Sequence, residues 1–167
     1  MSNITFSRVT SKDDYPILMK LARQIWAITY QDILSPAQFD YMIQMMYAPD
    51  VIEKEIGEGI VFEMVKDGTV PVGFISYGPY AQGVIKLHKL YLSKEYHGMG
   101  VGSQMLSRVK EIARTLGAKK LLLNVNKQNA RAIRAYERNG FKRVREEKNP
   151  IGNGYFMDDY VYGVDLV

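Results

Sequence analysis

The stretch that decides the fold lies in the middle of the chain and runs Tyr96-His97-Gly98-Met99-Gly100-Val101-Gly102-Ser103. It follows Val84–Leu92, which predicts a strand, and it opens a segment with the spacing of an amphipathic helix. Glycine accepts positive φ and lets the backbone approach a bulky group, so several N–H groups can converge on one anion. The start of the helix adds unpaired N–H groups and the positive end of its dipole. This pattern favours a phosphate or pyrophosphate site; a tight turn with glycines for packing alone is the open alternative.

Two common phosphate motifs do not fit this turn. A P-loop is excluded because no Gly-Lys-Ser/Thr follows at the required spacing. A dinucleotide fingerprint counted from Gly98 and Gly100 needs a third glycine where Ser103 stands. It also needs an acidic residue at the end of the next strand, where this chain has Asn124 and Asn126. The P-loop and the dinucleotide-binding interpretation therefore both fail for this turn.

The flanking sequence predicts one α/β (α+β) domain over residues 1–167. We expect strands at Asn3–Val9, Ile60–Lys66, Val70–Tyr77, Val84–Leu92, Lys119–Val125, Phe141–Glu147 and Phe156–Leu166. We expect up to five helices. The first is capped by Asp13 or Asp14, the second starts at Ser35-Pro36, and the third covers Val51–Gly57. The fourth ends at Gly117 and has an apolar face, and the fifth covers Ala130–Asn139; the residues of that apolar face are Val101, Met105, Val109, Ile112 and Leu116. Asp67-Gly68 is a hairpin signal, and a turn is expected around Pro150–Gly154. The result is a mixed, mostly antiparallel sheet of about seven strands with one parallel central pair made by a right-handed crossover, flanked by four or five helices.

The segment Tyr91–Gly102 resembles the acetyl-coenzyme A signature of the GNAT superfamily of N-acetyltransferases, whose core is Gln/Arg-x-x-Gly-x-Gly/Ala. Gly100 and Gly102 match its two small positions. His97 stands where the family usually has Arg or Gln. A neutral histidine donates one hydrogen bond but lacks the forked, permanent charge of arginine. We therefore expect weaker and more pH-sensitive cofactor binding at this position.

A second segment, Asn126–Phe141, is similar to the downstream motif of the same family, Asn-x-x-Ala-x-x-x-Tyr-x-x-x-Gly-Phe. The matching residues are Asn129, Ala132, Tyr136, Gly140 and Phe141. Asn129 and Tyr136 fall on one helix face, so the tyrosine hydroxyl would point toward the helix N-terminus. The alternatives are that Tyr136 is a core aromatic and that Asn129 only caps the helix. The resemblance covers about Val84–Glu147 and implies a GNAT-like fold with a splayed parallel pair.

The resemblance also implies the chemistry. Acetyl-coenzyme A (acetyl-CoA) would lie between the strands Leu87–Leu92 and Leu121–Val125, and backbone groups near Leu90–Leu92 would polarise its thioester. Tyr136 would protonate the departing thiolate after direct attack by a bound amine. The implied cofactor-binding residues are Leu90, Tyr91, Leu92, His97, Gly98, Met99, Gly100, Val101, Gly102, Ser103, Asn124, Asn129, Ala132 and Tyr136.

The acceptor amine must be neutral when it attacks. For an amine with a pKa near 10.4, deprotonation at pH 7 costs roughly 4.6 kcal/mol, which makes a general base valuable. His88 on the cofactor strand is the candidate, with Glu63 as a weaker one and a half-buried structural histidine as the alternative. Aromatic residues such as Trp26 and Tyr30, together with Asp158-Asp159, suit a cationic amine. The segments Trp26-x-x-Thr29-Tyr30 and Asp158-Asp159-Tyr160 resemble a bacterial branch that includes polyamine acetyltransferases. Core aromatics and a solvated turn are the alternatives. A peptide amino terminus, an amino acid and an antibiotic amine stay open.

Composition narrows the function further. The chain has no cysteine and two histidines, so no disulfide, thiol nucleophile or metal site is expected. The net charge of +4 is dispersed, which argues against a nucleic-acid partner but would attract a polyanionic cofactor. No apolar run approaches the roughly 18 residues that span a bilayer, so we expect a cytoplasmic protein and no membrane partner. A non-catalytic acyl-CoA sensor is the alternative function, against which Tyr136 argues, and a homodimer stays open.

Overall fold

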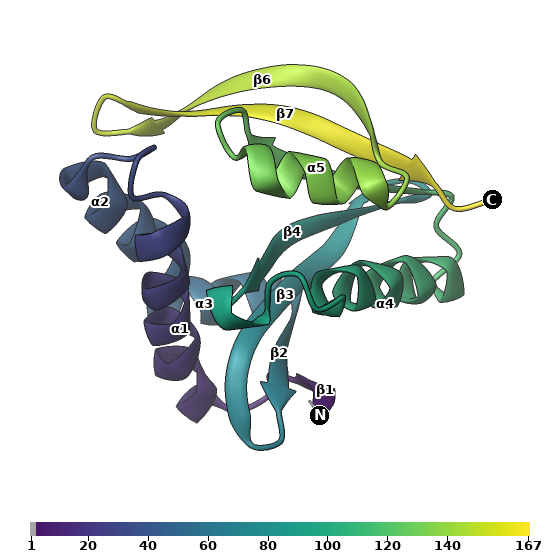
Figure 1. The fold of residues 1–167 in the computed structure, drawn as a ribbon, viewed down its shortest axis with the longest axis horizontal. Helices are drawn as coiled ribbons and strands as arrows, with labels where there is room; N and C mark the ends of the chain where they lie inside the picture. The colour runs from purple at the N-terminus through teal and green to yellow at the C-terminus, as the bar shows by residue number, and fades with distance from the viewer. Residues whose placement is uncertain (1–2) are drawn as a thin grey trace. The chain divides into compact units, whose positions relative to one another are not determined.

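The structure is a computed structural model that describes residues 3–167. In this part of the chain it has seven strands, five α-helices and two 3₁₀ helices (Figure 1). The strands are β1 (Ile4–Arg8), β2 (Val61–Asp67), β3 (Val70–Ala81), β4 (Val84–Leu92), β5 (Lys120–Asn126), β6 (Lys142–Gly152) and β7 (Tyr155–Asp165). The helices are η1 (Lys12–Asp14), α1 (Tyr15–Thr29), α2 (Pro36–Tyr47), α3 (Pro49–Gly57), η2 (Lys94–Tyr96), α4 (Val101–Thr115) and α5 (Ala130–Arg138).

The strands are hydrogen bonded in the order β1-β2-β3-β4-β5-β7-β6. Strands β4 and β5 run parallel, with Val84 opposite Lys120 and Leu87 opposite Leu123. The pairs β1–β2, β2–β3, β5–β7 and β6–β7 are antiparallel. The predicted mixed, mostly antiparallel sheet with one parallel pair is therefore confirmed.

The described chain divides into two compact units. The N-terminal unit comprises the residues up to Gly78 together with Lys89–Val101, and the C-terminal unit comprises Pro79–His88 together with Gly102–Val167. Strands β3 and β4 each contribute residues to both units. The single domain over residues 1–167 stays a prediction.

The core of the N-terminal unit is aromatic. The Trp26 ring on α1 lies 4.8 Å from the Tyr30 ring and 5.6 Å from the rings of Tyr47 and Tyr91, measured between centroids. Tyr47 and Tyr91 also contact Phe74, which lies on β3. These contacts pack α1 and α2 onto strands β3 and β4. The apolar α1 positions expected from the sequence are buried; they are Leu18, Leu21, Ala22, Ile25 and Trp26.

The predicted start of α2 is confirmed, and the predicted cap of α1 is wrong. The Ser35 side chain accepts a hydrogen bond from Gln38 N, and Pro36 takes the first position of α2. Asp14 precedes α1 but forms no side-chain cap bond within the described chain, because its backbone is already helical. Ser11 caps instead: its backbone is extended and its side chain accepts from Asp13 N, which starts η1 before α1.

In the C-terminal unit, β5 and helices α4 and α5 supply the core, and α5 lies beside β7 (Figure 1). The Tyr162 hydroxyl of β7 donates to Glu137 of α5 at 3.0 Å. Leu116 does not belong to the buried face of α4 as expected: it follows the last helical residue and is 64% exposed. The turn predicted at Pro150–Gly154 is shorter, because Pro150 lies within β6. This strand is at the edge of the sheet, and its pairing is irregular just after Pro150, which is where a strand tolerates proline.

None of the helices within residues 3–167 is long and apolar enough to cross a membrane.

Candidate active site

The glycine turn between η2 and α4 has the geometry expected of an anion site. Gly98 and Gly100 adopt φ values of 76° and 81°, in the left-handed region that favours glycine. A Cβ atom added at either one, or at Gly102, would meet no heavy atom of the described residues within 4 Å. The first N–H groups of α4, from Val101 onward, have no acceptor within their own helix. An open backbone surface that leads into a helix N-terminus fits a pyrophosphate group.

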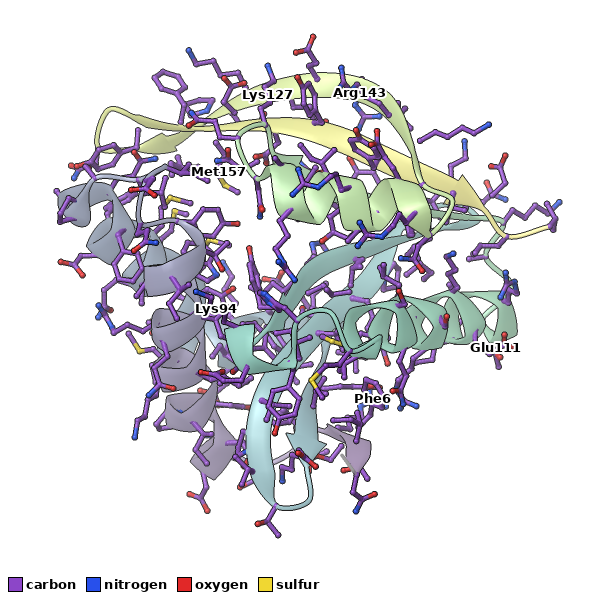
Figure 2. All side chains as sticks on the ribbon, in the orientation of Figure 1. Phe6, Lys94, Glu111, Lys127, Arg143 and Met157 are labelled. Atoms are coloured by element: carbon purple, nitrogen blue, oxygen red, sulfur yellow. The ribbon has the colours of Figure 1, made fainter. Side chains whose placement is uncertain are left out.

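His97 takes a position that the sequence did not predict. Its ring atom Nε2 lies 3.0 Å from the carbonyl oxygen of Leu92, and because a carbonyl only accepts, this nitrogen carries the proton. Its backbone N–H donates to the carbonyl oxygen of Lys94, also at 3.0 Å. The ring N–H and the backbone N–H of His97 therefore both bind within the segment that joins β4 to η2. Figure 2 labels Lys94, which lies on η2. A bond from the His97 ring to the cofactor stays a prediction, and the observed role is to tie the turn to β4.

Leu90, Tyr91 and Leu92 form the end of β4, where the thioester was expected. The Tyr91 hydroxyl lies 3.1 Å from that of Tyr30, and its ring belongs to the aromatic core. Gly73 of β3 packs against this segment so closely that an added Cβ would lie 2.5 Å from the Tyr91 carbonyl oxygen. Gly73 was not among the predicted site residues, although an isolated glycine inside a strand pattern is the signal that marks such a close approach.

Tyr136 lies on α5 in the C-terminal unit. The helix starts where expected, because the Asn129 side chain accepts a hydrogen bond from Ala132 N at 3.3 Å and caps it. The Tyr136 side chain is buried, and its ring contacts Phe141 at a centroid distance of 5.9 Å. The cap role of Asn129 and a packed Tyr136 ring are therefore both present. Proton donation by the Tyr136 hydroxyl, and the contacts of Asn129 and Ala132 with the cofactor, stay predictions.

A pair of carboxylates joined by one amide lies on strands β5, β6 and β7. The side-chain nitrogen of Asn124 donates to Glu147 at 3.2 Å and to Asp159 at 3.4 Å. Burial raises the pKa of Asp159, which is only 3% exposed, although the bond from Asn124 opposes the shift. Burial also acts to raise the pKa of Glu147, but the bonds from Asn149, Arg145 and Asn124 outweigh it and leave that pKa lowered. We call Asn124, Glu147 and Asp159 the carboxylate pair with its amide.

Asp158 does not join this pair, although the sequence grouped it with Asp159. Neighbouring residues of a strand point to opposite faces. Asp158 forms an ion pair with Lys127 at 2.9 Å, and Lys127 also pairs with Glu146 at 2.8 Å. Figure 2 labels Lys127 and Arg143 along the β6–β7 hairpin. Glu147 was missed because only the register, which places it opposite Asp159, brings the two carboxylates together.

The two candidate bases differ in exposure. The His88 side chain on β4 is exposed rather than half-buried, so the structural alternative given for it is wrong. Glu63 of β2 is 4% exposed and accepts a 2.7 Å hydrogen bond from the Tyr77 hydroxyl. Exposure favours His88, and its role as the base stays a prediction.

Comparison with solved structures identifies the class of fold. The crystal structure of PaiA N-acetyltransferase from Thermoplasma acidophilum in complex with coenzyme A matches with a TM-score of 0.83 and 25% identity, over 98% of this chain and 99% of that one. A putative GNAT acetyltransferase from Desulfovibrio desulfuricans matches with a TM-score of 0.74 and 19% identity, over 99% of this chain and all of that one.

Sequence comparison gives the family. The model of the acetyltransferase (GNAT) family matches residues 18–141, and the chain belongs to this family. It is 29% identical to spermidine N(1)-acetyltransferase of Thermoplasma acidophilum over 140 residues, which are 81% of this chain and 86% of that one. It is 30% identical to spermine/spermidine N(1)-acetyltransferase of Bacillus subtilis over 79 residues, which are 42% of this chain and 52% of that one.

The protein is thus an N-acetyltransferase that transfers an acetyl group from acetyl-CoA to an amine. The family, the fold, the enzyme class and the acetyl-CoA cosubstrate predicted from the sequence are confirmed. Nothing in the comparisons favours the non-catalytic sensor.

Proposed function

We propose that the acceptor is a small polycationic amine of the polyamine class, acetylated by direct attack in a ternary complex. The observation that carries the acceptor class is the match to a spermidine N(1)-acetyltransferase over 81% of the chain. The carboxylate pair with its amide supports it, because Glu147 and Asp159 supply negative charge suited to a second ammonium group. We also propose that the enzyme works in the cytoplasm, as expected from the sequence.

The turn Gly98–Ser103 is proposed to hold the pyrophosphate of acetyl-CoA through backbone N–H groups. The left-handed glycines and the open space around them support this role. The end of β4, Leu90–Leu92, is proposed to hold the pantetheine arm and the thioester carbonyl. On the C-terminal unit, Asn124, Asn129, Ala132 and Tyr136 are proposed to face the cofactor.

Acetyl-CoA supplies an activated acyl group, and the protein manages the protons. His88 is proposed to take one proton from the acceptor ammonium, which makes the amine a nucleophile. As the C–N bond forms and the C–S bond breaks, the Tyr136 hydroxyl donates a proton to the departing thiolate. The attacking nitrogen then gives up one of its two remaining protons to become the amide nitrogen, and the Tyr136 phenolate regains a proton. The sequence has no cysteine to carry the acetyl group, which agrees with direct attack.

Calorimetric titration of acetyl-CoA against the wild type and Gly100→Glu tests the turn. The glutamate adds a negative charge where the pyrophosphate is proposed to lie, so binding in the micromolar range should disappear. Gly117→Glu is the matched control: its φ is 82°, its Cβ would also meet no described atom within 4 Å, and it lies just past the other end of α4. If both variants bind acetyl-CoA equally well, the turn does not hold the pyrophosphate.

Steady-state kinetics test the acceptor and the order of events. Spermidine should give a higher kcat/KM than a lysine peptide, an amino acid or an aminoglycoside at the same concentration. Double-reciprocal plots against both substrates should intersect, as a ternary complex requires. Parallel lines would contradict direct attack, and a peptide preferred over spermidine would contradict the polyamine class.

A further inference from the structure

A single carboxylate in the N-terminal unit joins three segments of the chain. Asp67 ends β2 and begins the hairpin turn to β3. One of its oxygens accepts the backbone N–H of Asn3 at 2.8 Å, and the other accepts the Tyr96 hydroxyl at 2.7 Å. Gly68 N donates to the Asn3 carbonyl oxygen at 3.0 Å and closes the link to the start of β1. The hairpin turn is therefore hydrogen bonded both to Asn3 and to the Tyr96 side chain.

Tyr96 is the last residue of η2, two residues before the first glycine of the turn. Backbone bonds hold the start of this segment: Ser93 N donates to the Val72 carbonyl oxygen at 2.8 Å, and Tyr96 N donates to the Ser93 carbonyl oxygen at 3.0 Å. The bond between Tyr96 and Asp67 ties the end of the segment to the hairpin. Beyond Tyr96 the chain runs through Gly98 and Gly100, and glycine loses more conformational entropy on ordering than any other residue. Because Tyr96 is held two residues before Gly98, the turn visits fewer conformations.

The charge on Asp67 strengthens this link. The hydrogen bonds from the Tyr96 hydroxyl and the Asn3 N–H hold the pKa of Asp67 below its ordinary value. The Asp67 carboxylate in turn raises the pKa of Tyr96, so the phenol keeps its proton and donates it. A hydrogen bond to an ionised acceptor is shorter and stronger than one between neutral groups.

We propose that Asp67 and Tyr96 are positioning residues for acetyl-CoA, which hold the turn Gly98–Ser103 in its binding conformation before the cofactor arrives. This inference rests on the proposed role of that turn. Ordering a binding loop in advance lowers the entropy lost on binding and so increases affinity. Asp67 and Tyr96 act through the backbone of the turn, so they should change affinity for acetyl-CoA and not the rate of the chemical step at saturation.

Tyr96→Phe is the sharpest test, because it removes one hydroxyl and keeps the ring. The Kd for acetyl-CoA, measured by calorimetry, should rise about 3- to 10-fold, the effect of one hydrogen bond. The KM should rise by a similar factor with kcat unchanged. As a single change, Asp67→Ala should also weaken binding of acetyl-CoA. Combined with Tyr96→Phe it should add little to the loss, because both changes remove the hydrogen bond between Tyr96 and Asp67. Asp67→Asn keeps one acceptor oxygen and should fall between Asp67→Ala and the wild type.

Tyr80→Phe is the control, since it removes the hydroxyl of a half-exposed tyrosine on β3. Hydrogen exchange of the free protein gives a readout that does not depend on activity: Tyr96→Phe should speed exchange at Gly98–Gly102 and leave α1 unchanged. Equal loss of protection in α1 would overturn the inference, because the link would then serve overall stability.

Binding separates failure of this inference from failure of the proposed function. If Gly100→Glu abolishes binding while Tyr96→Phe and Asp67→Ala leave the Kd unchanged, the turn binds the cofactor and the positioning role is wrong. If Gly100→Glu binds acetyl-CoA like the wild type, the role of the turn is wrong and the inference falls with it.

Discussion

Asp159 shows how a single buried carboxyl can lower stability at neutral pH. Its side chain is 3% exposed, and burial raises its pKa above the ordinary value. A carboxyl with a raised folded-state pKa stabilises the fold below the ordinary pKa, and this contribution is lost as the pH rises through the raised value. At neutral pH the ionised group therefore costs folding free energy.

We expect Asp159→Asn to increase the free energy of unfolding at pH 7 by roughly 1 kcal/mol, because it removes a buried charge and keeps an acceptor for Asn124. The difference from wild type should shrink as the pH falls through the raised pKa of Asp159 toward its ordinary value. The same variant should raise the KM for spermidine about 10-fold and leave a monoamine unaffected, since one charge-assisted contact is lost. Urea unfolding at several pH values and steady-state kinetics measure both. A destabilised variant with an unchanged KM would contradict the role of the carboxylate pair.

Lys89 is a second buried charge, in the N-terminal unit. Its side chain is 5% exposed, pairs with Glu55 at 3.4 Å, and lies 5.3 Å from the Phe62 ring centroid and 5.5 Å from that of Tyr47. Burial lowers its pKa, and Glu55 opposes the shift. A lysine with a lowered pKa destabilises the fold most below that pKa, and stability recovers as the pH rises toward about 10.4.

We expect Lys89→Met to stabilise the protein by about 1 kcal/mol at pH 7, because well-packed apolar groups often replace buried ion pairs without loss. The Glu55 side chain is 28% exposed and stays hydrated when its partner is gone. The advantage of the variant over wild type should shrink as the pH rises through the lowered pKa of Lys89 toward about 10.4. Glu55→Gln should have the opposite sign, since it leaves Lys89 buried without its carboxylate. Urea unfolding decides, and a loss of stability in Lys89→Met would show that the ring contacts and the ion pair outweigh burial.

At the scale of elements, strand β3 positions strand β4. Gly73→Ala would place a Cβ 2.5 Å from the Tyr91 carbonyl oxygen and 3.3 Å from Leu92 Cα, and both are backbone atoms that cannot turn aside. We expect a loss of about 1–3 kcal/mol in the free energy of unfolding, as for other overpacked sites. The Kd for acetyl-CoA should rise, because the end of β4 must shift. Gly57→Ala is the control: its Cβ would meet no described atom within 4 Å. An unchanged Kd in Gly73→Ala would argue that Leu90–Leu92 does not contact the cofactor.

Elements with local signals were predictable from the sequence. The bounds predicted for β4 match those observed, Asp67-Gly68 indicated the β2–β3 hairpin, and Ser35-Pro36 indicated the start of α2. The parallel pair followed from the strand, helix and strand order, which allows one hand of crossover. The strand bounds, the hairpin and the helix start depend on neighbours within a few residues, so the sequence carries them directly.

Contacts set by register or by side-chain direction were not predictable. Glu147 meets Asp159 only in the observed register of β6 and β7, and that register shifts at Arg143–Arg145. The contact between Tyr96 and Asp67 spans 29 positions, and no local pattern marks it. The side-chain direction of His97 was not predictable either: its ring lies on the Leu92 carbonyl oxygen, and its bond to the cofactor stays a prediction.

For the whole molecule, the net charge of +4 favours a polyanionic cofactor such as acetyl-CoA. A ligand that binds only the folded state stabilises it by about 2.7 kcal/mol at 100 times its Kd. For a protein of this size we therefore expect a rise in Tm of roughly 5 to 10 °C, since each kcal/mol shifts Tm by about 2–4 °C. Differential scanning calorimetry with and without acetyl-CoA measures it, and 0.5 M NaCl should reduce the shift by screening.

Acetylpantetheine separates this general effect from the proposed site. It carries the same thioester and the same arm but no pyrophosphate, so it can use the end of β4 and not the glycine turn. At equal concentration we expect it to raise Tm by less than about a third as much as acetyl-CoA, because the charged part of the ligand contributes the hydrogen bonds to ionised groups. Gly100→Glu should reduce the acetyl-CoA shift to the level of acetylpantetheine and leave the acetylpantetheine shift intact. Equal shifts from both ligands in the wild type would mean that the pyrophosphate binds weakly or not at all. The glycine turn would then only connect η2 to α4 and would not bind the cofactor.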